Sequence, residues 1–179
     1  RMRDREKERA LAATAITNSE LKIQHPKRWM IEKYLLAEEC GWVCPYTGRK
    51  FGMRELLGRD AQFDVEHIWP FSQSLDNSFL NKTICYHEEN RTRKGSRTPR
   101  RAYSDQGLAT ILDRVKKFRG DRFAVREKLK RFTEEIEDGF TGSHLAETRY
   151  IGRLACDYLG TLYGGRVEGA GTDASARRI

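Results

Sequence analysis

The sequence lacks long apolar segments. No hydrophobic run approaches the ~18 residues that a membrane-spanning helix needs, and the charged start RMRDREKERA has no signal-peptide pattern. Hydrophobic residues make up 38% of the 179 residues and charged residues 34%, which is little apolar material for a chain of this size. We therefore expect one domain with a small core and solvated helical arms. Because the chain starts abruptly and without Met, we also expect a piece of a longer protein.

Cysteines are few, and they do not form zinc-binding pairs. Without secretory features, reduced thiols are favoured over disulfides. A structural zinc site normally has two Cys-x-x-Cys hooks, but Thr47 stands three residues after Cys44, and Glu88 three residues after Cys85. Each hook thus has a single thiol, so buried thiols are favoured and no structural zinc is expected. The cysteines are Cys40, Cys44, Cys85 and Cys156.

Acidic residues are outnumbered by basic ones. The net charge is +8 and the isoelectric point is about 9.5. This balance suits a polyanionic partner such as a nucleic acid, although charge alone is a weak indicator.

The spacing of apolar residues predicts a mostly helical α+β protein. Alternating residues over 61–68 and the apolar stretch 82–86 predict two short strands. A polar helix over 87–94 follows and is closed by Gly95. Together these segments form a compact ββα unit. Helices are also predicted over 1–23, over 27–40 (where an aromatic stripe starting at Trp29 indicates core packing), from 108 onward and after Gly139, and residues 164–179 are expected to fray.

The chemistry concentrates between residues 63 and 98. Glu66 offers a hard carboxylate ligand and Asn90 an amide oxygen, which together suit Mg²⁺ (with Mn²⁺ as a substitute) and leave room for water and phosphate. His67 can serve as general base, because the ordinary pKa of histidine is near neutral. Asn81 can orient the His67 ring or the loop beneath it. These residues predict one-metal hydrolysis of a phosphodiester.

Each of these residues has an ordinary explanation when taken singly. A lone histidine on a strand is usually a core or surface residue, and an isolated asparagine is usually a cap or turn residue. Neighbouring strand residues also face opposite ways, so Glu66 and His67 can share a site only where the strand ends or bulges. Pro70 favours such an end. Only the joint order of acid, histidine and two amides favours a catalytic site.

A basic run follows the last of these residues. Placed beside a phosphate-cutting site, it indicates contacts to nucleic-acid backbone phosphates rather than to bases. Its members are Arg91, Arg93, Lys94, Arg97, Arg100 and Arg101.

Four segments together resemble a His-Asn-His (HNH) nuclease domain of the ββα-metal, or His-Me finger, class. More narrowly, they are similar to the domain inside type II CRISPR RNA-guided DNA endonucleases (CRISPR-associated protein nine), most like the type II-C branch. The segments are IEKYLLAEECGWVCPYTGR, FDVEHIWPFSQSLDNSFLNKT, ENRTRKGSRTP and GFTGSHLAETRYIGRLACDYL. They span most of residues 31–159.

The resemblance implies a role for each matching residue. Glu66 and Asn90 become metal ligands, His67 the general base and Asn81 a supporting amide. Two departures matter: many relatives have Asp in place of Glu66, and the third histidine of simpler HNH enzymes is here Asn90, with His87 as a less favoured substitute.

The resemblance also implies a domain plan and partners. Residues 1–25 would be a helical linker from the RuvC nuclease, 26–138 the HNH domain with a ββα core at about 61–95, and 139–179 a linker helix back to RuvC with a flexible tail. The domain would cut the target DNA strand paired with the guide RNA. Its partners would be that heteroduplex, the guide RNA bound by the full-length effector, and the parent's RuvC and recognition lobes, in a prokaryotic cytoplasm.

Two rival functions stay open. A stand-alone HNH homing or restriction enzyme would cut specific sequences without RNA. A non-catalytic nucleic-acid-binding ββα module would bind without metal and would be indifferent to Glu66→Ala and His67→Ala.

Overall fold

The computed structural model describes residues 2–136, together with Ala155 and Tyr158. Residues 2–136 belong to the first of two compact units, and only this unit is described below. Cys156 and the predicted fraying tail lie outside the described residues, as do the predicted helix after Gly139 and the fourth resembling segment apart from Ala155 and Tyr158. None of the described helices is long and apolar enough to cross a membrane.

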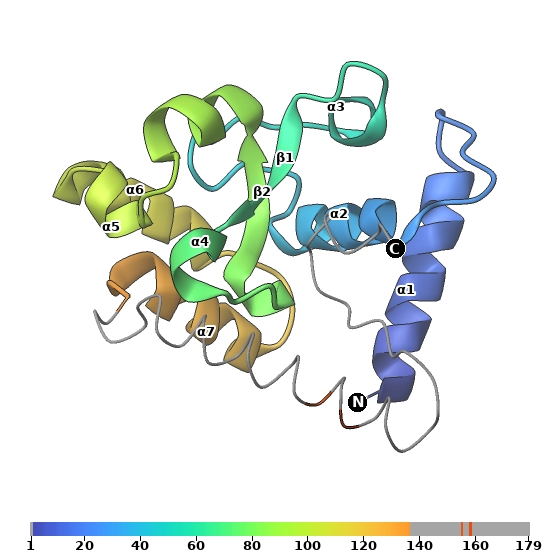
Figure 1. Cartoon of the computed structure of the whole chain (residues 1–179). Coiled ribbons are helices and arrows are strands. Elements are labelled where there is room, and N and C mark those ends of the chain that lie inside the picture. Colours follow the sequence, from blue (N-terminus) through green and yellow to red (C-terminus); the bar gives the residue numbers. More distant parts are fainter. Residues whose placement is uncertain (1, 137–154, 156–157, 159–179) are drawn as a thin grey trace, which may run out of the picture. The chain divides into compact units, whose positions relative to one another are not determined.

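Short helices make up most of this unit (Figure 1). Helix α1 places Ala12 and Ile16 in the core, and the rest of it is largely exposed. The predicted helices over 1–23 and 27–40 are present with shorter bounds. The helices are α1 (Met2–Thr17), α2 (Arg28–Glu39), α3 (Met53–Leu57), α4 (Phe71–Ser74), α5 (Pro99–Ala102), α6 (Asp105–Val115) and α7 (Arg122–Thr133).

A two-stranded antiparallel sheet lies at the centre of the unit (Figure 1). Strand β1 (Phe63–His67) pairs with β2 (Lys82–Tyr86), and Phe63 faces Tyr86 at one end of the pairing. Both strands fall within the predicted segments, so the small sheet and the mostly helical α+β class are confirmed. Strand β2 is buried along most of its length, because α2 packs against the sheet.

The segment after β2 differs from the ordinary helix that was predicted. Residues Glu89–Lys94 form a π-helix (η2). The Gly95 amide donates to the Asn90 carbonyl at 2.8 Å, a bond five residues apart that widens the turn. Gly95 ends the helix at φ 53°, a conformation that favours glycine. The widened turn carries Asn90 and Lys94 to the same pocket.

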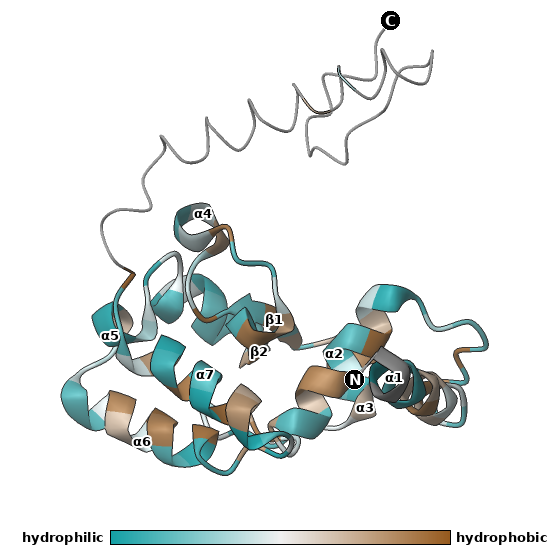
Figure 2. Ribbon diagram, turned by 90° about the horizontal axis from the view of Figure 1, so that it is seen from below, coloured by the Kyte–Doolittle hydropathy of each residue, from teal (hydrophilic) through white to brown (hydrophobic). Residues whose placement is uncertain are grey.

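The core is small and rich in aromatic rings. Phe51 stacks on Phe63 with ring centroids 4.3 Å apart, and Phe132 from α7 packs against Tyr46. Figure 2 shows apolar and polar bands alternating along α6 and α7. On α6 the buried residues recur with helical spacing, as predicted: Leu108, Ile111 and Val115.

Two expectations about core residues have different outcomes. Three of the cysteines, Cys40, Cys44 and Cys85, are free and buried, as predicted. The aromatic stripe on α2 was expected to be core, but Trp29 is 51% exposed. The rest of the stripe is packed as predicted, since Met30 and Tyr34 lie against the core and Leu36 is buried in it. Trp29 lies in the first turn of α2 and faces away from this packed side.

A buried ion pair joins α7 to α2 and the sheet. The Lys128 ammonium contacts the Glu39 carboxylate and donates to the Lys82 carbonyl at 2.6 Å. Lys128 is fully buried and Glu39 nearly so. Burial raises the pKa of Glu39 and lowers that of Lys128, while each charge counters the shift of the other. Loss of either side chain would therefore leave the other as an unpaired buried charge and would destabilise the fold.

Replacing this lysine tests the pair. We expect Lys128→Met to lower the free energy of unfolding by about 3–5 kcal/mol, because it leaves the Glu39 carboxylate buried without a cation. Urea denaturation followed by circular dichroism measures the change. The control is Lys130→Met on the same helix, whose lysine is exposed and pairs with an exposed acid, with an expected change within about 0.5 kcal/mol. Equal effects of the two substitutions would contradict the prediction.

Candidate active site

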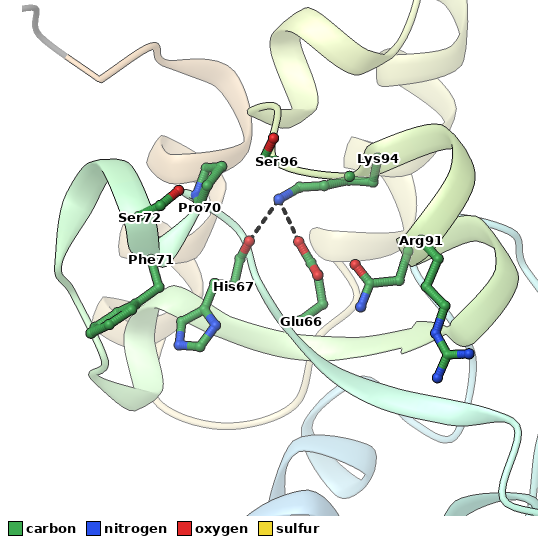
Figure 3. A pocket seen from close by; sticks show the side chains of 10 residues that line it. Glu66, His67, Pro70, Phe71, Ser72, Arg91, Lys94 and Ser96 are labelled. Atoms are coloured by element: carbon green, nitrogen blue, oxygen red, sulfur yellow. Dashed lines mark hydrogen bonds and ion pairs between the residues drawn. The ribbon is translucent and has the colours of Figure 1, made fainter. Parts of the chain in front are cut away.

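A pocket of about 310 Å³ lies between the end of β1, the start of α4 and the π-helix η2 (Figure 3). It brings together three of the four predicted catalytic residues. The residues that line it are Glu66, His67, Pro70, Phe71, Ser72, Asn90, Arg91, Lys94, Gly95 and Ser96.

The wall of this pocket holds a carboxylate and an ammonium group that are both buried. Glu66 is 6% exposed and Lys94 is 1% exposed. The Lys94 Nζ contacts Glu66 Oε1 and also donates to the His67 carbonyl oxygen at 2.8 Å (Figure 3). Lys94 thus bridges the carboxylate and the backbone at the end of β1.

Burial dominates the electrostatics of this pair. It raises the pKa of Glu66 to about 7, against the opposing effects of the Lys94 charge and a hydrogen bond from Asn90. Burial also lowers the pKa of Lys94, and the Glu66 charge opposes that change. A carboxylate with so high a pKa has too little cationic and hydrogen-bonding support to offset its lost hydration. It is therefore a favourable place for a further cation.

The adjacency of Glu66 and His67 is accommodated by the end of the strand. Strand β1 ends at His67, as Pro70 had suggested. Figure 3 shows the Glu66 carboxylate directed toward Lys94 and the His67 ring directed toward Phe71, with ring centroids 5.6 Å apart. Both residues line the pocket, but their functional groups point to different parts of it.

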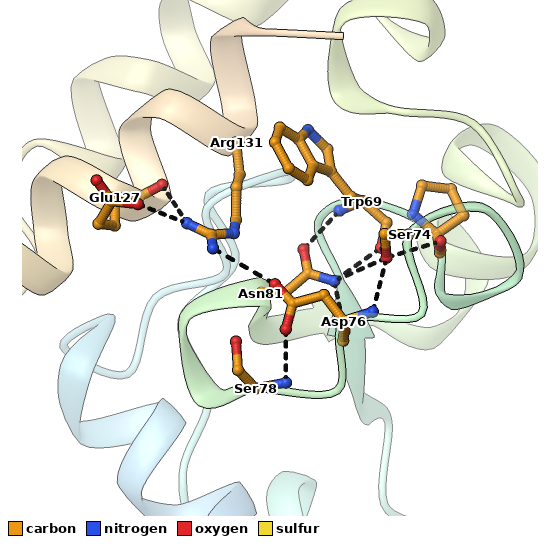
Figure 4. A network of polar contacts seen from close by, with 8 residues as sticks. Trp69, Ser74, Asp76, Ser78, Asn81, Glu127 and Arg131 are labelled. Carbon is orange, nitrogen blue, oxygen red and sulfur yellow. Dashed lines mark hydrogen bonds and ion pairs between the residues drawn. The ribbon is translucent and has the colours of Figure 1, made fainter. Parts of the chain in front are cut away.

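Asn81 has a different place from the other predicted residues. It is fully buried and does not line the pocket. Its Oδ1 accepts from the Trp69 amide at 2.9 Å, and its Nδ2 donates to the Trp69 and Asp76 carbonyls at 2.9 and 2.8 Å (Figure 4). Of the two roles left open by the sequence, these contacts fit bracing of the loop between β1 and β2.

The His67 ring is held instead by Asn77. His67 Nε2 and Asn77 Oδ1 are 3.0 Å apart. Asn77 was not among the predicted site residues, and nothing in its spacing distinguishes it from a turn residue. Lys94 was likewise predicted as a phosphate contact, whereas it is buried against Glu66. No sequence signal indicated either contact.

Most of the basic run is engaged by acidic side chains within residues 2–136. Arg91 is 3.7 Å from Asp64 and lines the pocket, and Arg97 donates to the Arg93 carbonyl. The arginines remain exposed, so their predicted contacts to phosphate stay a prediction. The other acid pairs are Arg93–Glu89 at 3.9 Å, Arg100–Asp105 at 2.6 Å and Arg101–Glu135 at 3.0 Å.

The donors in the pocket fit a hard metal ion. Glu66 supplies carboxylate oxygens and Asn90 an amide oxygen, the ligand types that divalent magnesium and manganese prefer. In the part of the chain that the structure describes, no three His, Cys, Asp or Glu side chains gather so as to hold a metal.

Comparison with known proteins agrees with this arrangement. Residues 44–100 match the family model described as HNH endonuclease, so the chain contains an HNH nuclease domain, of the class that cleaves DNA and generally depends on a divalent metal. More particularly, it matches the HNH domain of the CRISPR-associated endonuclease Cas9.

The curated relatives are much longer than this chain. It is 30% identical over 143 residues to a Cas9 of Streptococcus thermophilus, a match that covers 75% of the chain and 13% of the relative. It is 29% identical over 146 residues to the Cas9 of Staphylococcus aureus, covering 74% and 14%. The chain thus spans about one-seventh of the relatives it matches.

Solved structures agree in fold. A crystal structure of Streptococcus thermophilus Cas9 in complex with the AGAA PAM superposes with a TM-score of 0.64 at 21% identity, covering 90% of this chain and 17% of that one. The type II-C Cas9 of Actinomyces naeslundii gives a TM-score of 0.59 at 20% identity, covering 76% and 14%. At these identities the likeness concerns the fold alone.

Removing the ammonium group tests the electrostatics of the pocket. We expect Lys94→Met to raise the pKa of Glu66 further above 7, by about 1–3 units, because an opposing positive charge is lost. Carboxyl carbon chemical shifts followed against pH measure it. Arg100→Met is the control, since Arg100 pairs with Asp105 and does not line the pocket, and it should leave the Glu66 pKa unchanged. An unchanged or lower Glu66 pKa in Lys94→Met would contradict the assignment.

Proposed function

We propose that this chain is the domain that cuts the guide-complementary DNA strand in a Cas9-type effector, with one metal ion and a histidine base. The observation that carries the proposal is the buried Glu66 carboxylate, with its pKa raised to about 7, in one pocket with His67 and Asn90. Burial of an acid that lacks full compensation is unfavourable for stability and is typical of functional sites.

Each side chain has a distinct task in the proposed reaction. Glu66 and Asn90 offer oxygen ligands on one side of the pocket, and His67 offers a nitrogen base on the other. A bound divalent ion, Mg²⁺ by preference, would neutralise charge on the phosphoryl oxygens. His67 would take the proton of the attacking water. Asn81 would keep the β1–β2 loop in shape beneath it.

Lys94 affects how the site can bind a metal. Its ammonium holds Glu66 Oε1 and the His67 carbonyl. A metal bound by Glu66 would therefore either share the carboxylate with this ammonium or displace it. Exposed Arg91 at the same pocket is placed to attract a DNA phosphate.

The substrate and partners follow from the relatives. These relatives are Cas9 proteins, and the Streptococcus thermophilus structure is a complex with a PAM. We propose by analogy that guide RNA pairing selects the DNA and that this domain reads only backbone geometry. The same proposal includes a longer type II-C parent with RuvC and recognition lobes. It also includes the linkers predicted at 1–25 and 139–179 and the ββα-metal class of the nuclease unit.

A nicking assay tests the histidine. In the full-length, guide-loaded protein with labelled target strand, we expect His67→Ala to slow target-strand cutting by about 10²- to 10⁴-fold, the usual contribution of a general base. His87→Ala is the matched control, because His87 stacks on Tyr86 and does not line the pocket. Target-strand cutting that persists in His67→Ala would refute the role of His67. RNA-independent cutting by the isolated chain would favour a stand-alone enzyme.

Metal binding by the chain provides a separate test. A raised pKa of about 7 means that Glu66 is mostly ionised above pH 7 and mostly protonated below it. Because a metal requires the ionised form, we expect Mn²⁺ affinity measured by calorimetry to fall about tenfold from pH 8 to pH 6. The Glu66→Gln chain should not bind at either pH. Equal affinity for Mn²⁺ at both pH values would contradict Glu66 as the ligand. If the protein is inactive and its DNA binding is unaffected by a metal chelator, a non-catalytic binding module would be favoured.

A further inference from the structure

The His67 ring has one polar partner within residues 2–136. Its Nε2 lies 3.0 Å from Asn77 Oδ1, and its face packs against Phe71 with a 41° angle between the rings. Asn77 is exposed and lies in the loop between α4 and β2. These two contacts fix both the tilt of the ring and the direction of its Nε2.

We propose that Asn77 is a positioning residue for His67, an inference that rests on the proposed role of His67 as base. An amide oxygen can only accept a hydrogen bond, so Oδ1 requires the proton on Nε2. The lone pair is then on Nδ1, which becomes the basic nitrogen. Asn77 thus determines which nitrogen can take a proton from water, in addition to holding the ring.

The loop that carries Asn77 is held on both sides of it (Figure 4). The Asp76 carboxylate accepts from the Ser78 amide at 2.9 Å, which closes a tight turn around Asn77. The Asp76 carbonyl accepts from the side-chain Nδ2 of buried Asn81 at 2.8 Å. Before this turn, Leu75 ends α4 in the left-handed conformation at φ 54°. The position of Asn77 relative to β1 is therefore set by the side-chain-to-backbone bonds of its neighbours as well as by its own side chain.

Helix α7 holds the same loop from outside. Arg131 Nη2 lies 3.4 Å from Asp76 Oδ2, and Arg131 Nη1 donates to the Glu127 carboxylate at 3.1 Å. The Arg131 guanidinium also lies over the Trp69 ring, 5.4 Å from its centroid. One arginine thus contacts the loop that begins after His67 at two points, Trp69 and Asp76, which makes a rigid support for an orienting amide.

Nitrogen NMR of the histidine side chain gives the first test, without reference to activity. In the metal-free 179-residue chain near pH 8, we expect the His67 ring to be in the Nε2–H tautomer. Asn77→Ala should give a mixture of tautomers, and Ser78→Ala, which removes a neighbouring exposed side chain but keeps its backbone bond to Asp76, should match the wild type. A wild-type ring with its proton on Nδ1, or an unchanged tautomer in Asn77→Ala, would overturn the proposal. The wild-type spectrum decides the point even if Asn77→Ala does not fold.

Single-turnover nicking by the full-length, guide-loaded protein gives the second test. We expect Asn77→Ala to lower the cutting rate at saturating DNA by about 10- to 100-fold, as loss of an orienting partner commonly does, with little change in DNA affinity. Asn77→Asp keeps an accepting oxygen and should recover most of the rate. Wild-type cutting by Asn77→Ala, or a loss confined to DNA affinity, would contradict the positioning role. Failure of the proposed function is distinct, because His67→Ala itself would then cut normally.

Discussion

The contact between Glu66 and Lys94 is the interaction on which the site depends. The Glu66 carboxylate is only 6% exposed. Burying its charge lowers the stability of the fold unless a positive charge lies beside it. The π-helix supplies that charge, because its wide turn brings Lys94 inward while Asn90 still reaches the same pocket. The ammonium also binds the His67 carbonyl, so the end of β1, the acid and the helix are held by one group.

The loop between the strands depends on a second set of polar contacts. Asn81, fully buried, bonds to both backbone groups of Trp69 and to the Asp76 carbonyl. Arg131 reaches the same loop from α7. Buried polar groups of this kind specify one arrangement because any other would leave them without partners. The loop that follows His67 is therefore held by specific contacts at Trp69 and Asp76.

Local patterns predicted the elements well where one periodicity was dominant. Alternation over 61–68 gave β1, and the apolar spacing of Leu108, Ile111 and Val115 gave the buried face of α6. The prediction for Trp29 was wrong, since helical spacing does not show where a helix stops packing against its neighbours. The π-helix was missed because its widened turn depends on a bond from Gly95 to Asn90 that an ordinary helical pattern does not distinguish.

The sequence by itself determined the type of site: an acid next to a histidine, amides at a set spacing and a basic run, in segments that match an HNH nuclease. Those properties depend on residue identity and order along a short stretch. Only the tertiary structure decided which amide supports which group, with Asn77 at the His67 ring and Asn81 in the loop. It also decided that the Lys94 side chain is buried against Glu66 instead of being exposed with the neighbouring arginines. These choices depend on burial and on contacts such as Arg131 with Asp76, 55 residues apart, which sequence order does not encode locally.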